Sequence, residues 1–192
     1  LLHWPASHVV KCLVFYHPDD DIQLRLLQED RVRQLYSDCR DLGRELLLEV
    51  IASSKGQPCD NSTIPNVMRR FYNLGVLPAW WKLESQTAAA WNEIGSVVNE
   101  FDPLCHGVLV LGLDAPEAEM KDSFRVAAPN PVCRGFAVGR SIFGDVARQW
   151  FDGQLDDQSV IDRVADNYKR MIRFWQEAAS GSTNDDEKQA TG

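Results

Sequence analysis

A lysine inside an apolar stretch is the first residue of this sequence with a type and position suited to chemistry. The stretch Pro78–Glu84 reads PAWWKLE and follows a turn that begins at Gly75, so it predicts a short strand. Alternation along a pleated strand places Lys82 on the same face as Trp80. If both faces of the strand are covered, Lys82 points into an apolar cleft, where a neutral amine can attack a carbonyl and form a Schiff base. The alternative is an edge-strand lysine that extends its ammonium group into water.

Further polar residues fall toward the ends of other apolar stretches. Glu49 lies late in the run ELLLEVI, and a carboxylate on the adjacent strand can exchange protons with a Schiff-base lysine. Such a carboxylate also favours the charged lysine, so the site needs apolar surroundings or a second cation, for which Lys11 is the candidate. Glu84 and Asp114 lie at later strand ends. His17, at the end of the first run, either contacts a substrate or is a hydrogen-bonded structural residue.

Two glycine-containing segments are suited to binding a phosphate group. In FAVGRS, Gly139 allows backbone N–H groups to approach an anion, the start of a following helix adds its dipole, and Arg140 offers a bidentate contact. Gly112, directly after VLVL, would supply the second half of a phosphate cup. The alternative for both glycines is a tight packing turn, with Arg140 as an ordinary surface residue.

The elements that must position these residues alternate along the chain. Apolar runs predict strands at 9–17, 45–51, 80–84, 107–112 and 135–139, and helical patterns are predicted at 24–42, 64–74, 87–101, 117–124, 146–151 and 159–179. This alternation predicts an α/β fold with a parallel sheet, either doubly wound or part of a barrel. Because no glycine-rich nucleotide-binding sequence follows the first strand, we favour TIM-barrel-like (βα) repeats, with five of the eight units present as the C-terminal part of a barrel.

Composition excludes several classes of function. The net charge of −8 argues against a nucleic-acid partner, and no apolar run approaches the roughly 18 residues that a membrane span needs. The five cysteines include no close C-x-x-C pair, so we expect reduced thiols in the cytoplasm. No group of His, Asp and Glu has the spacing of metal ligands, so we expect no metal, and we expect no other cofactor. No G-x-S-x-G sequence occurs, so the sequence shows no serine triad.

The organisation of the chain follows from the same patterns. We expect residues 1–179 to form one barrel-type unit and residues 180–192, which have no apolar face, to be a disordered tail. The chain has no initiating methionine and begins almost directly before a predicted strand. We therefore expect a fragment of a longer protein.

Five segments together resemble one protein family. They are VKCLVFYHPDD, ELLLEVI, WWKLE, VLVLG and RGFAVGRSIF, and the resemblance runs from about Trp4 to Ala179. They resemble the C-terminal aldolase-like domain of the bacterial myo-inositol catabolism protein, whose N-terminal part is 5-dehydro-2-deoxygluconokinase. That domain is similar to class I tagatose-1,6-bisphosphate aldolases, which are TIM barrels. The resemblance implies that the five strands are the fourth to eighth of a barrel and that the first three lie upstream.

The resemblance also implies a reaction and the residues that carry it. Lys82 would form the Schiff base, Glu49 would be its acid–base partner, Lys11 would be an auxiliary cation, and the substrate phosphate would be held by Gly112, Gly139 and Arg140. The implied reaction is cleavage of a phosphorylated keto-sugar acid, 6-phospho-5-dehydro-2-deoxy-D-gluconate, to dihydroxyacetone phosphate and malonate semialdehyde.

Two alternatives to this reaction stay open. One is a truncated, non-catalytic phosphosugar-binding or interaction module, because the open sheet edge of an incomplete barrel must be covered or paired with another copy. The other is an aldolase for a different phosphorylated ketose. The interpretation allows a fused N-terminal sugar kinase domain and a homo-oligomer as partners.

Overall fold

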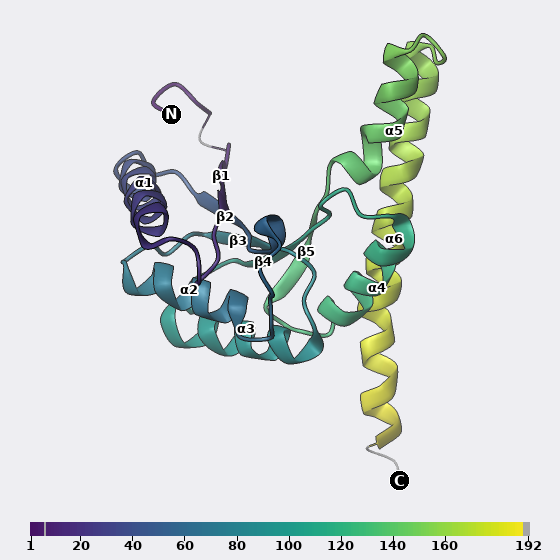
Figure 1. Ribbon diagram of the computed structural model, residues 1–192. Helices are drawn as coiled ribbons and strands as arrows, with labels where there is room; N and C mark the ends of the chain where they lie inside the picture. Colours follow the sequence, from purple (N-terminus) through teal and green to yellow (C-terminus); the bar gives the residue numbers. More distant parts are fainter. Residues whose placement is uncertain (6, 190–192) are drawn as a thin grey trace.

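The protein contains one parallel sheet of five strands (Figure 1). The computed structural model describes residues 1–5 and 7–189. The strands lie in chain order and are β1 (Val10–Phe15), β2 (Leu46–Ile51), β3 (Trp80–Leu83), β4 (Gly107–Leu111) and β5 (Cys133–Ala137). Each connection moves the chain one place along the sheet in the same direction, as in a TIM barrel, whereas a doubly wound sheet reverses its strand order. With β1 and β5 at its two edges, the sheet is part of a barrel, as predicted.

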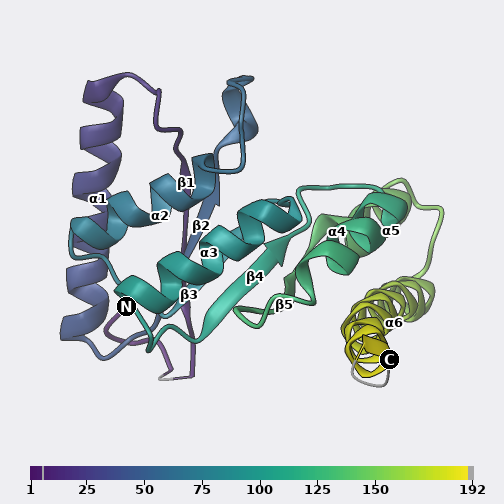
Figure 2. The ribbon, with the colours of Figure 1, turned by 90° about the horizontal axis from the view of Figure 1, so that it is seen from below.

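Helices follow the strands and cover one face of the sheet. Figures 1 and 2 show α1 (Ile22–Asp41), α2 (Thr63–Asn73), α3 (Ala88–Phe101) and α4 (Glu117–Ala127) along this face. A short 3₁₀ helix, η1 (Ser53–Lys55), follows β2. The last two helices, α5 (Arg140–Phe151) and α6 (Asp157–Gln189), run antiparallel to each other beyond β5.

The hydrophobic core lies between the sheet and these helices. The strand side chains that point toward the helices are fully buried; they are Leu48, Val50, Trp81, Leu83, Val108 and Val110. Trp81 also donates a hydrogen bond from Nε1 to the hydroxyl of Tyr72 on α2, at 2.8 Å. We call the other side of the sheet the open face. It is least covered at β1, where Leu13 is 38% exposed and Phe15 47% exposed.

Side-chain caps fix two of the turns that follow the strands. The carboxylate of Asp21 accepts hydrogen bonds from the N–H groups of Gln23 and Leu24, so it starts α1 after β1. The hydroxyl of Thr87 accepts the N–H of Ala90 and starts α3 after β3. Each cap satisfies N–H groups that a helix leaves free in its first turn. The loops at the carboxyl ends of these strands are therefore anchored where they join the helices.

The structure corrects several predicted bounds. β1 ends at Phe15, two residues before the predicted end, and β5 lies two residues earlier than predicted, with Arg134 as an extra residue in its pairing with β4. Residues 140–145, which lie between the predicted last strand and the helix predicted at 146–151, form the first part of α5. In α5, Ile142 and Val146 lie one turn apart and are both buried, while the adjacent Phe143 and Gly144 obscure this helical spacing in the sequence.

The longest helix reaches further than the sequence indicates. α6 continues to Gln189 and so includes most of the stretch 180–192 for which we expected disorder. An established helix extends easily, because each added residue gains a hydrogen bond without a new nucleation step. Residues 190–192 lie outside the described residues, and the division of the chain at residue 179 stays a prediction.

Candidate active site

Glu49 lies between two lysine side chains on the open face of the sheet. The register of the parallel ladder places Glu49 of β2 beside Leu13 of β1 and Lys82 of β3. Residues in register on neighbouring strands point to the same face, with the strands about 4.8 Å apart. Glu49 Oε1 is 3.1 Å from Lys82 Nζ, and Oε2 is 2.9 Å from Lys11 Nζ. We call Lys11, Glu49 and Lys82 the ion-pair row.

Burial differs along the ion-pair row. The side chain of Glu49 is 5% exposed, that of Lys82 is 15% exposed, and that of Lys11 is 50% exposed. Because β3 is the central strand of the sheet, Lys82 is not the edge-strand lysine considered as an alternative. Its neighbour in register on β4 is Leu109, so an aliphatic side chain lies beside it on the same face.

The chemistry available to the ion-pair row follows from these contacts. Its two ammonium groups and one carboxylate leave one positive charge, which favours an electron-rich group such as a carbonyl oxygen. The distance between Glu49 and Lys82 is within the range over which a proton can be transferred directly. An amine that can give up its proton to a neighbouring carboxylate is the arrangement that a nucleophilic lysine requires.

The loop after β4 approaches the loop after β5 closely. A Cβ atom added to Gly112 would lie 2.8 Å from Val138 Cγ1 and 3.4 Å from Ser141 Oγ, so this contact requires glycine. The next two residues, Leu113 and Asp114, have φ values of 47° and 62°, in the left-handed region that non-glycine residues seldom adopt. We call 112–114 and 138–141 together the glycine loops.

The glycine loops end at the first turn of α5. Gly139 is its N-cap, and Arg140 is its first residue, with Nη1 3.8 Å from Asp114 Oδ2. Ser141 Oγ is buried and has no hydrogen-bond partner among the described residues. A helix start, a guanidinium group and an unpartnered hydroxyl are all suited to an anion. Ser141 is not among the phosphate-binding residues predicted from the sequence, although its place directly after Gly139 and Arg140 could have indicated it.

Two other strand-end residues accept hydrogen bonds from the backbone of loops beside the sheet. His17 is buried, and its Nδ1 accepts a hydrogen bond from the N–H of Asp19 at 3.1 Å, which is the structural role considered for it. Glu84 accepts hydrogen bonds from the backbone N–H groups of Ala52 and Ser53 and does not belong to the ion-pair row.

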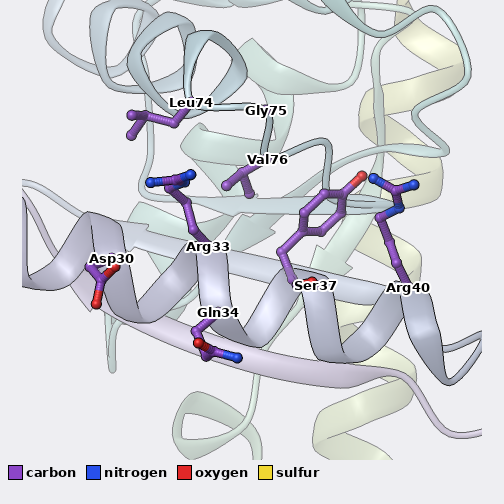
Figure 3. A pocket seen from close by; sticks show the side chains of 9 residues that line it. Asp30, Arg33, Gln34, Ser37, Arg40, Leu74, Gly75 and Val76 are labelled. Carbon is purple, nitrogen blue, oxygen red and sulfur yellow. The ribbon is translucent and has the colours of Figure 1, made fainter.

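A hollow of about 340 Å³ lies away from these residues, between α1 and the turn before β3. Figure 3 shows Arg33 reaching from α1 toward the turn formed by Leu74, Gly75 and Val76, with Arg40 farther along the same helix. This turn leads into the amino end of β3, whereas active sites of barrels form at the carboxyl ends of the strands. We therefore place the candidate site at the ion-pair row and the glycine loops.

Two classes of feature are not found in the part of the chain that the structure describes. Residues 1–5 and 7–189 contain no group of three or more His, Cys, Asp or Glu side chains that could hold a metal ion. Among the same residues, none of the helices combines the length and the apolar character needed to cross a bilayer.

The fold is that of an aldolase-like partial barrel. The solved structure of fructose-bisphosphate aldolase from Plasmodium falciparum, in complex with TRAP and a small-molecule inhibitor, is similar with a TM-score of 0.52 and 15% sequence identity. The match covers 92% of this chain and 56% of the aldolase chain, so this chain spans little more than half the length of that protein. The family model described as "Uncharacterized protein conserved in bacteria (DUF2090)" matches residues 1–179, and the chain belongs to that family. No curated protein matches the sequence.

Proposed function

We propose that this chain is the C-terminal part of a class I aldolase, which cleaves a phosphorylated keto-sugar acid through a Schiff base on Lys82. The observation that carries the proposal is the placement of Glu49 within 3.1 Å of Lys82 and 2.9 Å of Lys11, on the open face of a barrel-type sheet. The aldolase-like fold supports the same class of reaction. Lys11 is the proposed auxiliary cation. Because it also contacts Glu49, the carboxylate is shared between two ammonium groups and does not pair with Lys82 alone.

The proposed reaction uses Lys82 as the nucleophile and Glu49 as its acid–base partner. The neutral amine of Lys82 adds to the ketone carbon, and the carbinolamine loses water to give an iminium. Glu49 removes the proton of the hydroxyl group β to the iminium, the carbon–carbon bond breaks, and its electron pair moves into an enamine while an aldehyde leaves. The enamine then takes a proton, and water hydrolyses the iminium to release the ketone product and free Lys82.

The glycine loops are the proposed phosphate site. Gly112 and Gly139 allow backbone approach, Arg140 supplies a charge-assisted contact, and Ser141 offers a free hydroxyl. The phosphate anchors the half of the substrate that stays covalently attached to Lys82. For the substrate implied by the sequence resemblance, 6-phospho-5-dehydro-2-deoxy-D-gluconate, that half is dihydroxyacetone phosphate and the aldehyde is malonate semialdehyde.

Reductive trapping tests the proposal. The chain is incubated with dihydroxyacetone phosphate and sodium borohydride, and its intact mass is measured together with those of Lys82→Met, Lys11→Met and Lys169→Met. We expect one reduced adduct on the unmodified chain and on Lys169→Met, whose lysine is a surface residue with 72% of its side chain exposed. We expect none on Lys82→Met.

Other results of the same experiment change the assignment. An adduct that persists in Lys82→Met and disappears in Lys11→Met would exchange the roles of the two lysines. If a folded chain gives no adduct but a longer gene product does, the site needs additional strands. No adduct on either protein would contradict the proposed reaction.

A second candidate is non-catalytic phosphosugar binding. The observation that favours it is the open sheet, in which β1 and β5 are edge strands. Binding of dihydroxyacetone phosphate that depends on Arg140, without any trapped adduct, would support this alternative.

A further inference from the structure

Glu84 connects the loop that follows β2 to the end of β3. Its Oε2 accepts the N–H of Ala52 at 2.7 Å and the N–H of Ser53 at 3.2 Å, and its Oε1 accepts a short hydrogen bond from the Ser53 hydroxyl. These donors follow β2, which ends at Ile51, and Glu84 directly follows β3. The last pair in the ladder between the two strands is Val50 with Leu83. The hydrogen bonds of the Glu84 carboxylate therefore continue the connection between the two strands beyond the last backbone pair.

The catalytic pair lies next to this ladder end. Glu49 and Lys82 are in register one position before Val50 and Leu83. β3 contains only the four residues Trp80–Leu83, so its ladder to β2 is short. If the end of this ladder frays beyond Val50 and Leu83, the next pair that it reaches is Glu49 and Lys82.

A second set of bonds fixes the same two loops farther out. The hydroxyl of Thr87 donates to Asn61 Oδ1 at 2.6 Å, and Gln86 Nε2 donates to the carbonyl of Glu84 at 3.1 Å. The loop after β2 is thereby attached to the segment after β3 at both of its ends. Between the attachments lies a small cavity of about 130 Å³ whose lining includes Ser53 and Glu84.

We propose that Glu84 is a positioning residue for the Schiff-base site. It fastens the exit of β2 to the exit of β3, and it thereby holds Glu49 at proton-transfer distance from Lys82. The inference rests on the proposed function, because its consequence is a rate of Schiff-base formation. Since misplacement of reacting groups by about 1 Å can lower a rate roughly 100-fold, loss of this connection acts on the rate more than on substrate affinity.

The test measures adduct formation at increasing concentrations of dihydroxyacetone phosphate for the unmodified chain, Glu84→Ala, Glu84→Gln and Glu45→Gln. Glu45 is the matched control, since it accepts a hydrogen bond from Trp80 Nε1 at 3.1 Å and joins β2 to β3 at their opposite ends. All rates are measured at a temperature at which circular dichroism shows each variant folded.

We expect Glu84→Ala to lower the maximal rate of adduct formation by about 10- to 100-fold, with a change of less than about threefold in the half-saturating concentration. Glu84→Gln keeps one acceptor oxygen, so its maximal rate should lie between those of Glu84→Ala and the unmodified chain. Glu45→Gln should leave the maximal rate unchanged. Backbone amides of residues 52–62 should exchange hydrogen faster in Glu84→Ala.

Equal maximal rates for folded Glu84→Ala and the unmodified chain would overturn the positioning role while leaving the proposed function intact. An equal fall in the maximal rate of Glu45→Gln would also overturn the positioning role, because the effect would then be a general destabilisation of the pairing between β2 and β3. If neither the unmodified chain nor a longer gene product forms an adduct, the proposed function fails, and the positioning role fails with it.

Discussion

Two buried glutamates of this protein lie in similar charge environments on opposite sides of the sheet. Glu29 of α1 is 3% exposed, and its oxygens accept hydrogen bonds from Arg70 Nε at 2.9 Å and Nη2 at 2.6 Å and from the Tyr16 hydroxyl at 2.6 Å. Glu49 of β2 is 4% exposed and contacts the ammonium groups of Lys11 and Lys82. The first carboxylate lies among the helices and the second on the open face.

The basic partners decide what each glutamate can do. Burial alone would raise the pKa of Glu29, but the hydrogen bonds from Arg70 and Tyr16 outweigh it and hold this pKa below its ordinary value. Burial, and then the hydrogen bond to Glu29, raises the pKa of Tyr16 to about 12. Arginine stays protonated and binds a carboxylate with a rigid fork, whereas lysine is a mobile point charge that can lose its proton. The Glu29 cluster is therefore a fixed structural contact, while the lysine partners of Glu49 are of the type that the proposed reaction requires.

Among the substitutions that test the difference between the Glu29 cluster and the ion-pair row, Glu49→Gln should have the largest effect. The amide cannot take a proton from Lys82 or from a substrate hydroxyl, so we expect the rate of Schiff-base trapping to fall about 1,000-fold. Intact-mass measurement over time gives this rate. Glu29→Gln, assayed where it is folded, should trap at the rate of the unmodified chain, and an equal loss in both variants would remove the distinction.

Arg70→Met tests the structural side of the comparison. It leaves the Glu29 carboxylate buried with Tyr16 as its remaining hydrogen-bond donor, so the free energy of unfolding should fall by roughly 3 kcal/mol, as measured by urea denaturation. Arg69→Met is the matched control, because the neighbouring Arg69 pairs at 2.8 Å with the partly exposed Glu93. Its cost should stay below about 1 kcal/mol. Similar losses of unfolding free energy in both variants would mean that the bonds between Arg70 and Glu29 stabilise the fold no more than the pair of Arg69 and Glu93 does.

The pH dependence of this stability has a defined sign. The pKa of Glu29 is lower in the folded protein than its ordinary value of 4.5, so its contribution is complete above about pH 4.5 and is lost as the pH falls through the lower, folded value. The difference in unfolding free energy between the unmodified chain and Arg70→Met should therefore shrink below about pH 4.5. A difference that stays constant down to the acid transition would contradict the role of Arg70 in lowering this pKa.

The exposed pair of Asp114 and Arg140 should give the smallest effects. Its atoms are 3.8 Å apart and both side chains are at least half exposed, so neither substitution should change stability by more than about 1 kcal/mol. Arg140→Met should raise the half-saturating concentration of dihydroxyacetone phosphate in the trapping assay about tenfold, since it removes a charge-assisted contact to phosphate. Asp114→Asn should lower it, because a negative charge beside the phosphate is removed. Unchanged values for both variants would exclude the glycine loops as the phosphate site.

The sequence predicts the ion-pair row better than the Glu29 cluster, for a geometric reason. Parallel strands bring residues near their carboxyl ends into register, so Glu49 and Lys82 are expected to be neighbours. Lys11 lies early in β1 and pairs by register with Leu47, yet its long side chain still reaches Glu49. Glu29 and Arg70 are 41 residues apart on two helices, and only the packing of those helices brings them together.

Loop geometry limits prediction at the other half of the site. The glycines of the glycine loops are visible in the sequence, but the burial of Ser141 Oγ depends on α5 starting at Arg140, and the sequence predicts that start several residues later. The contacts of Glu84 likewise depend on where β2 and β3 end. These features follow from element boundaries, which periodicity locates poorly.

The stepwise strand order has a consequence for how the chain folds. Each strand pairs with the strand before it in the chain, so the sheet can grow by adding one strand–helix unit at a time. Contact between Glu49 and Lys82 needs only β2 and β3, whereas the glycine loops need β4, β5 and the start of α5. The ion-pair row therefore depends on the units up to β3, and the proposed phosphate site depends on the units after it.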